Sequence, residues 1–513
     1  MPSLLYSHWP KNLLLILLSF IFLPFDTFLF FAAYALRPFL RAASRKNGGA
    51  NVTKDAITNG GGGHRGDNGG QTILVTGVSM TKALVLTRLL HAHNPSHRII
   101  GADFHPLACG RASRSLSRFY VLSPPTAAGD ADPYITSLLR VIGAERCALW
   151  ISCSGVASAL EDGVAAEVVA KRTRCRVVQF GVADVRDLHE KDAFMERTRR
   201  LALRVPETRK VESADAMVAA LRRCVGLSAR RREKEGGCGG RRFIAKSVGM
   251  DDKSRGDLTL LPRATERETR EHVARLGVSK ERPWIVQEFV RGHEFCTHAL
   301  VVRGRVRAFL ACPSAELLMH YRALPADSPL SRAMLAFTER QTEPGGEAFT
   351  GHLSFDFLVK DEDVEKTDPE SIALYPIECN PRAHTADVLL DGSMELADEY
   401  LAVLRDDPST KDIVTPKQPL KYYWVGHDLV QLFLLPVLST LTGQAPVIET
   451  AKSVREFIEH ILFWKDGTFE VWDPLPWWWL YHVYWPMQFV NSIRTGRKWS
   501  RINVSTTKMF DCN

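Results

Sequence analysis

The sequence predicts an α/β region built on an open parallel sheet, followed by an α+β region with antiparallel strands. Strand and helix patterns alternate from Thr72 to Leu203, which is typical of a parallel sheet. Further along, the apolar runs His352–Val359 and Ile372–Cys379 flank a charged connection, which favours two neighbouring antiparallel strands. A long apolar segment precedes the α/β region, and an aromatic segment follows the α+β region.

The distribution of charge separates the two ends from the body of the chain. A length of 513 residues is enough for about three domains. The formal charge of +8 divides into +4 at residues 1–46, +4 at residues 491–513 and zero between them. A neutral body argues against nucleic acid as the partner. Ten cysteines at irregular spacing, without a C-x-x-C pair, indicate free thiols in a reducing compartment.

The N-terminal segment Leu13–Leu36 is almost continuously apolar and, as a helix, is long enough to cross a bilayer core of ~30 Å. Pro24 and Asp26 interrupt it near its middle, so both a kinked span and a shallow hairpin are open. Cationic residues that follow, among them Arg37 and Arg41, place the downstream chain in the cytosol by the positive-inside rule. A cleavable signal peptide is the alternative. We expect a membrane anchor with the catalytic region facing the cytosol.

The elements of the α/β region follow a glycine-rich linker at residues 47–70, which predicts a flexible connection. We expect strands at Thr72–Val75, His97–Ala102, Ala148–Cys153 and Val177–Phe180, and helices at Thr81–Ala92, Ser158–Lys171 and Leu188–Leu203. The turn after the first strand contains only Gly77 and lacks the G-x-G-x-x-G spacing, so we assign no dinucleotide there. The basic, glycine-rich insertion Arg230–Arg242 is typical of a solvated segment, and we assign it no function.

The two antiparallel strands carry a candidate metal site. Successive side chains of a strand alternate between its faces, so Glu378 and Asn380 point to one side and Cys379 to the other. Asp356 lies in the facing strand and can join them. Two carboxylates and an amide oxygen are ligands that suit Mg²⁺ when it also holds nucleotide phosphates. A hairpin with acidic side chains facing water is the alternative.

This arrangement resembles the metal-binding strands of the ATP-grasp superfamily, which includes D-alanine–D-alanine ligase, biotin carboxylase and carbamoyl phosphate synthetase. The match is Asp356, the Glu378-x-Asn380 pair and the Asn380-Pro381-Arg382 turn. The resemblance implies a Rossmann-like preATP-grasp domain before an α+β ATP-grasp domain, and it covers about Thr72 to Leu404. It also implies ATP and Mg²⁺ as cofactors.

Further motifs occur upstream in the order that the superfamily requires. Lys191, in a segment like the superfamily's H/D-x-K, and Lys246, inside the apolar strand Phe243–Val248, would bind ATP phosphates. The charged segment Gly249–Gly256 would be the glycine-rich loop over the phosphates. By the same resemblance the adenine would be lined by Gln287, Glu288, Phe289 and Val290, and the ribose hydroxyls bound by Glu294.

The catalytic residues implied by the resemblance are Lys246 and Arg382. In D-alanine–D-alanine ligase an arginine lies two residues before the metal-binding acid, but here that position is Ser354. Arg382 is therefore the candidate that stabilises an acyl phosphate or fixes a substrate carboxylate bidentately.

The C-terminal segment has a different composition. Trp472–Val490 carries seven Trp and Tyr residues beside Arg494, Arg497, Lys498 and Arg501. Such a segment suits the headgroup layer of a membrane, and an aromatic cap packed on the catalytic domain is the alternative. The expected divisions are an anchor at 1–46, a linker at 47–70, the preATP-grasp domain at 71–190, the ATP-grasp domain at 191–405 and an extension at 406–513.

The resulting prediction is an ATP- and Mg²⁺-dependent ligase that joins a small-molecule carboxylate to an amine, or less often a thiol, through an acyl phosphate. We expect lipid contacts through both ends and no nucleic acid. The layout resembles membrane-tethered ligases of fungal specialised metabolism. The alternatives are a carboxylase or kinase of the same fold, and a membrane-bound nucleotide sensor without turnover.

Overall fold

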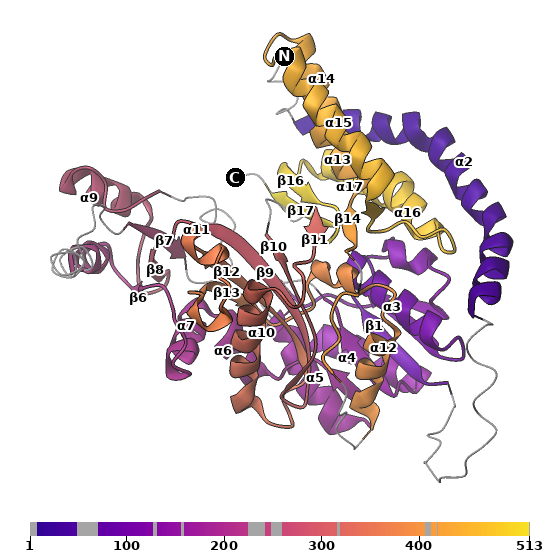
Figure 1. Ribbon diagram of the computed structural model, residues 1–513, viewed down its shortest axis with the longest axis horizontal. Helices are drawn as coiled ribbons and strands as arrows, with labels where there is room; N and C mark the ends of the chain where they lie inside the picture. The colour runs from indigo at the N-terminus through magenta and orange to yellow at the C-terminus, as the bar shows by residue number, and fades with distance from the viewer. Residues whose placement is uncertain are drawn as a thin grey trace.

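The computed structural model describes residues 8–48, 70–126, 131–154, 159–223, 242–247, 259–314, 319–405, 412–417 and 419–511 (Figure 1). The predicted linker, the basic insertion at 230–241 and the glycine-rich loop at 249–256 lie outside these residues.

The first region is a five-stranded parallel sheet in the order β3-β2-β1-β4-β5, as the alternating pattern predicted. Its strands are β1 (Thr72–Thr76), β2 (Arg98–Asp103), β3 (Arg118–Val121), β4 (Leu149–Ser152) and β5 (Arg176–Val178). Its helices are α3 (Thr81–His93), α4 (Asp132–Glu145), α5 (Ala159–Arg172), α6 (Val182–His189) and α7 (Lys191–Arg200). β3 and α4 had no sequence prediction. The single helix expected at Leu188–Leu203 is wrong, because Glu190 is extended and separates α6 from α7.

Two antiparallel sheets follow, which confirms the predicted α+β region. The smaller has the order β6-β8-β7, with β6 (Thr208–Val211), β7 (Phe243–Ser247) and β8 (Trp284–Glu288). The larger has the order β10-β9-β12-β13, with β9 (His293–Val302), β10 (Arg305–Pro313), β12 (Gly351–Val359) and β13 (Tyr375–Asn380). α9 (Glu266–Arg275) begins at a capping box on Thr265 and packs on the smaller sheet through Val273. α10 (Pro329–Thr342) packs on the larger sheet.

The remaining elements surround these sheets. Near the larger sheet are η4 (Glu343–Gly345), α11 (Asp361–Val364), η5 (Pro369–Ser371), η6 (Thr385–Leu390), α12 (Met394–Leu401) and η7 (Ala402–Leu404), and η1 (Cys109–Ala112) precedes β3. The C-terminal region holds β14 (Lys421–Tyr423), α13 (Val425–Asp428), η8 (Leu429–Leu434), α14 (Leu435–Leu441), α15 (Val447–Phe463), β15 (Lys465–Asp466), α16 (Leu475–Trp479), η9 (Leu480–Tyr484), α17 (Trp485–Thr495), β16 (Trp499–Asn503) and β17 (Lys508–Asp511). β14 forms a small sheet with β15 and with β11 (Tyr321–Arg322).

One hydrophobic core joins parts that are distant in the chain. It includes Val75 of the parallel sheet, Leu310 of the larger antiparallel sheet, and Trp424 and Trp485 of the C-terminal region, all of them buried. The C-terminal region is therefore part of the folded body and not an appendage to it.

The N-terminal helix α2 (His8–Gly48) is continuous, so the hairpin at Pro24 is not formed. Residues Trp9–Pro38 are long and apolar enough to cross a membrane. Asp26, which the sequence placed alone in an apolar segment, is paired with His482 of η9 at 2.9 Å. The pair removes the cost of an isolated charge in an apolar environment.

Both ends of the apolar part of α2 contact the same folded body. Near one end, Lys11 donates to the Trp499 carbonyl, and the β16–β17 hairpin is tied to α3 by a hydrogen bond from Thr81 N to Ser505 O. Near the other end, the Arg114 guanidinium lies 5.8 Å from the Tyr34 ring. Lys11 and Tyr34 are about 35 Å apart along a helix, more than a bilayer core of ~30 Å. A perpendicular span would place one body on both sides of the bilayer, so these contacts favour an α2 that lies along the body.

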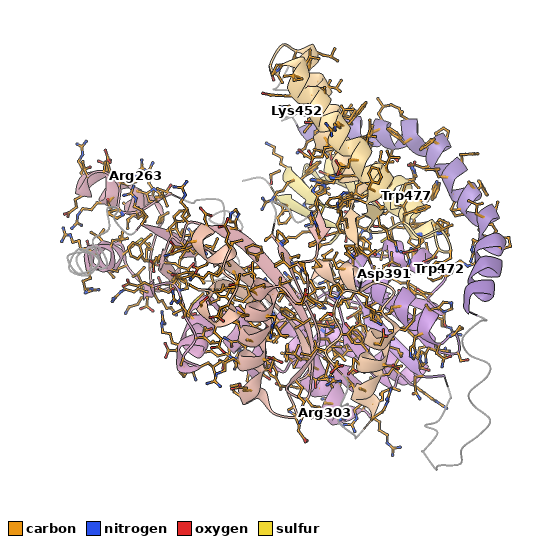
Figure 2. The ribbon with its side chains drawn as sticks, viewed as in Figure 1. Arg263, Arg303, Asp391, Lys452, Trp472 and Trp477 are labelled. Atoms are coloured by element: carbon orange, nitrogen blue, oxygen red, sulfur yellow. The ribbon has the colours of Figure 1, made fainter. Side chains whose placement is uncertain are left out.

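The aromatic C-terminal segment is largely internal. Trp477, labelled in Figure 2, is buried with Trp485 and Trp499, and Phe489 stacks between the last two rings at 5.8 Å from each. The density of tryptophan therefore reflects packing against α2 and the parallel-sheet region. The sequence left two alternatives open for this segment. For these buried side chains the aromatic cap packed on the folded body is correct, and a position in the headgroup layer of a membrane is wrong.

Candidate active site

The three residues predicted as metal ligands lie together on adjacent strands. Asp356 of β12 and Glu378 of β13 are direct partners across the ladder, and a register shift follows at Phe357. Such bulges bend a strand and re-aim its side chains. Cys379 points the other way into the core with Phe355, as the alternation predicted. The two carboxylates thus project from one face of the sheet.

Asn380 bridges the two carboxylates. Its Nδ2 donates to Asp356 Oδ2 at 3.3 Å and to Glu378 Oε1 at 3.2 Å. Its Oδ1 accepts a hydrogen bond from Arg382 Nη2 at 3.3 Å. The amide nitrogen occupies the position in which a cation would interact with both acids. For Asn380 itself to be a metal ligand, its amide would have to turn so that Oδ1 faces the ion.

The donor set fits a divalent cation. Burial, reinforced by the Glu378 and Glu294 charges, raises the pKa of Asp356 well above its usual range. Ser354, on the same face of β12, has a buried hydroxyl with no hydrogen-bond partner in the described part of the chain. Carboxylates this close repel each other unless a positive charge lies between them. Asp356, Glu378 and Asn380 would hold Mg²⁺, the ion that suits such oxygen ligands.

Lys246 faces this site from the smaller sheet. Its ammonium donates to Gln287 Oε1 at 2.8 Å, on the neighbouring strand β8. Burial, with a smaller effect of the Lys191 charge, lowers the pKa of Lys246 to about 8 against the opposing charges of Glu378, Glu294 and Asp356. Two cations and three acids from both sheets and α7 therefore act on one another. The structure brings together predicted residues that are 187 positions apart in the chain, from Lys191 to Glu378.

Several of the residues predicted to bind adenine and ribose already have hydrogen-bond partners within the protein. Gln287 is buried and binds Lys246, and Glu294 accepts a hydrogen bond from Ser314. Glu288 N donates to Glu207 O, and Phe289 N donates to Arg242 O, both at 2.8 Å. These two N–H groups are engaged in the protein, so a base edge would have to meet carbonyl groups of this segment or Val290.

Lys82 is a buried cation that the sequence analysis missed. Its ammonium donates to Ser154 O at 3.1 Å and to Ala383 O at 2.7 Å, the residue after Arg382. Burial, with the Arg382 charge, lowers the pKa of Lys82 to about 7. Lys82 joins the segment after β4 to the turn that follows β13, and so fixes the position of Arg382 in that turn. The only signal in the sequence is a lysine in an otherwise apolar first turn of α3.

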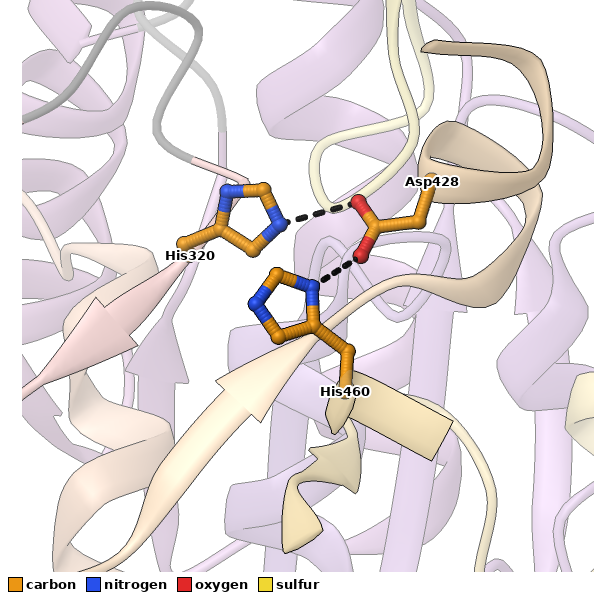
Figure 3. Close-up of side chains that lie close together, drawn as sticks. All are labelled: His320, Asp428 and His460. Carbon is orange, nitrogen blue, oxygen red and sulfur yellow. Dashed lines mark hydrogen bonds and ion pairs between the residues drawn. The ribbon is translucent and has the colours of Figure 1, made fainter. Parts of the chain in front are cut away.

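A second polar cluster lies in the C-terminal region (Figure 3). His320 Nε2 is 2.9 Å from Asp428 Oδ1, and His460 Nδ1 is 2.6 Å from Asp428 Oδ2. Asp428 is fully buried, and its pKa is lowered by the two imidazoles despite its burial. The separations are those of hydrogen bonds, and the three side chains tie β11 to α13 and α15.

The chain has a parallel α/β sheet followed by two antiparallel sheets with polar side chains between them, the arrangement that the sequence predicted. No family model and no curated protein matches the chain. The solved structures to which it is similar include three enzymes at 10–16% identity. These are the L-amino acid ligase of Bacillus licheniformis (10% identity, 66% of this chain and 75% of that one, TM-score 0.42), the N5-carboxyaminoimidazole ribonucleotide synthetase of Thermus thermophilus (16%, 68% and 81%, 0.45) and the biotin carboxylase–ATP analogue complex of Campylobacter jejuni (13%, 66% and 72%, 0.45). Likeness at this level carries no inference about the substrates of this chain.

Proposed function

We propose that the protein is an ATP- and Mg²⁺-dependent ligase that joins a small-molecule carboxylate to an amine through an acyl phosphate. The observation that supports this most is the convergence of Asp356, Glu378 and Asn380 with Lys246 from the facing sheet. A strand lysine that loses hydration needs an anion beside it, and a polyphosphate supplies one. The same site holds acids that need a cation. A Mg²⁺–nucleotide satisfies both.

The proposed reaction has two steps. A carboxylate oxygen of the substrate attacks the γ-phosphorus of ATP, the bond to ADP breaks, and an acyl phosphate forms. The amine nitrogen then attacks the acyl carbon, the bond to phosphate breaks, and the amine loses a proton. Mg²⁺, when bound, offsets the charge of the phosphates.

Each residue has a role in these steps. Lys246 and Lys191 bind phosphate oxygens and hold them in line with the substrate carboxylate. Arg382 donates to oxygens of the carboxylate or acyl phosphate, and its contact with Asn380 couples its position to the metal ligands. Gln287 fixes the Lys246 ammonium. Glu294 would bind the ribose, and Glu288, Phe289 and Val290 would line the base.

The finer assignments belong to the same proposal. We divide the catalytic body into a preATP-grasp domain at 71–190 and an ATP-grasp domain at 191–405. The resemblance to membrane-tethered fungal enzymes supports a role in specialised metabolism. The free cysteines of the described residues, which fit a reducing compartment, support a cytosolic active site.

The test is ADP release by the full chain with pooled carboxylic acids and pooled amino acids, with and without hydroxylamine. A ligase releases ADP only when a carboxylate is present, and hydroxylamine converts its acyl phosphate to a hydroxamate. Bicarbonate-dependent ADP release would identify a carboxylase instead. ATP binding without ADP release in any pool would identify the nucleotide sensor and contradict the proposal.

A further inference from the structure

A large apolar cavity lies between α2 and the C-terminal helices. Its volume is about 1040 Å³, at the upper end of small-molecule sites. α2 contributes Leu15, Leu18, Phe22 and Leu29, and the opposite walls come from η8, α15, η9 and α17. The ligase residues described above do not line it. It is therefore a separate site.

Three polar side chains of this cavity, Ser19, Asp26 and His482, are linked to one another by hydrogen bonds. Ser19 Oγ donates to Tyr481 O at 2.9 Å and lies 3.0 Å from His482 Nδ1. The other nitrogen of His482 pairs with Asp26. The indole N–H groups of Trp464, Trp477 and Trp485, which also line the cavity, have no hydrogen-bond partner in the described part of the chain. The rest of the lining is mostly aliphatic and aromatic, which suits a hydrocarbon chain better than a polar metabolite.

The outer rim of the cavity is apolar and exposed. Phe25, Phe433, Ile461, Leu462 and Phe463 line the cavity, yet each is exposed, Phe463 to 73%. Large exposed side chains that surround a cavity mark a surface that meets an apolar phase. The outer face of α2 continues this surface with Leu17, Phe20, Phe28 and Phe31. Since both ends of the apolar part of α2 contact the body, this face lies along one leaflet and not across the bilayer.

The wall of the cavity also contains a cationic side chain. Lys421 lines the cavity, and its ammonium lies 5.5 Å from the centre of the Trp464 ring. Among the described residues no carboxylate pairs with it. The neighbouring Lys465 differs, because it is held by Asp391 at 2.7 Å and by Glu470. Lys421 therefore offers a positive charge to a ligand whose chain occupies the cavity.

We propose that this cavity binds the hydrocarbon chain of an amphiphile with an anionic head, which enters from one membrane leaflet past the apolar rim and places its head at Lys421. A free long-chain carboxylate and a bilayer phospholipid share this chemistry. The proposal does not depend on the ligase reaction, and its test does not use turnover.

The experiment uses the full chain in vesicles and two photoreactive probes, a long-chain fatty acid and a phosphatidylglycerol, each with a diazirine in its chain. We expect either probe to label peptides of α2 and α15 that line the cavity, in competition with unlabelled lipid. Labelling by the fatty acid alone identifies a free carboxylate, and labelling by both identifies any leaflet amphiphile. Labelling restricted to the outer face of α2 with both probes would overturn the proposal.

Matched variants separate the cavity from the outer face. Leu18→Trp fills the cavity, whereas Leu17→Trp adds the same volume at a neighbouring residue that is 54% exposed and does not line it. We expect Leu18→Trp to lower labelling at cavity peptides by about tenfold and Leu17→Trp to leave it unchanged. Val430→Phe on the opposite wall provides a second filling variant, and far-UV circular dichroism verifies folding. Equal labelling in all variants would overturn the cavity site, and undiminished fatty-acid affinity in Lys421→Gln would overturn the head position.

Discussion

Replacing Lys246 by methionine tests two things together: the proposed phosphate site, and the loss of folding stability that a buried lysine causes. A pKa that falls from 10.5 to about 8 corresponds to roughly 3 kcal/mol of destabilisation while the lysine is charged in both folded and unfolded chains. Methionine removes this cost. It also leaves Gln287 Oε1, on a buried side chain, without its 2.8 Å donor, which costs about 1–3 kcal/mol. The free energy of unfolding without nucleotide should therefore change by about 0 to +2 kcal/mol.

The sign of the pH dependence follows from the same shift. Because the folded pKa of Lys246 is lowered, the destabilisation is fully present below about pH 8 and is lost as pH rises toward 10.5. The stability of Lys246→Met relative to the wild type should therefore fall by roughly 3 kcal/mol over that interval, so that the variant becomes the less stable protein at high pH. Denaturant unfolding at several pH values measures it.

With ATP and Mg²⁺ the two proteins should separate sharply. The wild type should gain thermal stability on nucleotide addition, and Lys246→Met should lose most of that gain, with a higher KM for ATP and a lower kcat. Lys210→Met is the control, since Lys210 is more exposed and pairs with Asp192 at 3.0 Å. A variant that is several kcal/mol less stable without nucleotide, and still stabilised by ATP as the wild type is, would refute the reasoning.

Three other results are expected. Glu378→Gln and Asn380→Ala should each lower Mg²⁺-dependent turnover by more than roughly a hundredfold while circular dichroism stays unchanged, and near-native kcat at saturating Mg²⁺ would remove them as ligands. Arg88→Ala should destabilise the fold by about 3–5 kcal/mol in chemical unfolding, because it removes the cation that pairs at 2.9 Å with the fully buried Asp473. A loss under about 1 kcal/mol would contradict this. A protease site inserted before α2 should be cut from the side of sealed vesicles on which the catalytic body lies. Cutting only from the opposite side would show that α2 spans the bilayer.

The sequence predicted those elements whose signals lie within a few residues of one another. The alternation in β12 and β13 gave the shared face of Glu378 and Asn380, and the apolar strand around Lys246 indicated a buried cation. The start of α10 also follows from local signals, because Ser328 caps it and Pro329 occupies the first turn.

Long-range pairing was not available from the sequence in the same way. Asp26 looked like a charge stranded in a membrane segment because its partner, His482, is 456 residues away. The tryptophans of the C-terminal segment have the composition of a membrane interface, but composition does not state which surface covers them. Lys82 was missed for the same reason, since Ala383 is 301 residues from it.

The pairing of α2 with the last part of the chain has a consequence for the order of synthesis. At about 5–20 residues per second, His482 leaves the ribosome about 20–90 s after Asp26. Throughout that interval α2 exists without the wall that completes its cavity, and its apolar surface is fully open. A nascent chain in this state is a substrate for targeting factors and for aggregation alike. Delivery to a membrane during translation would cover the apolar surface of α2 until η9 and α17 are synthesised and pack against it.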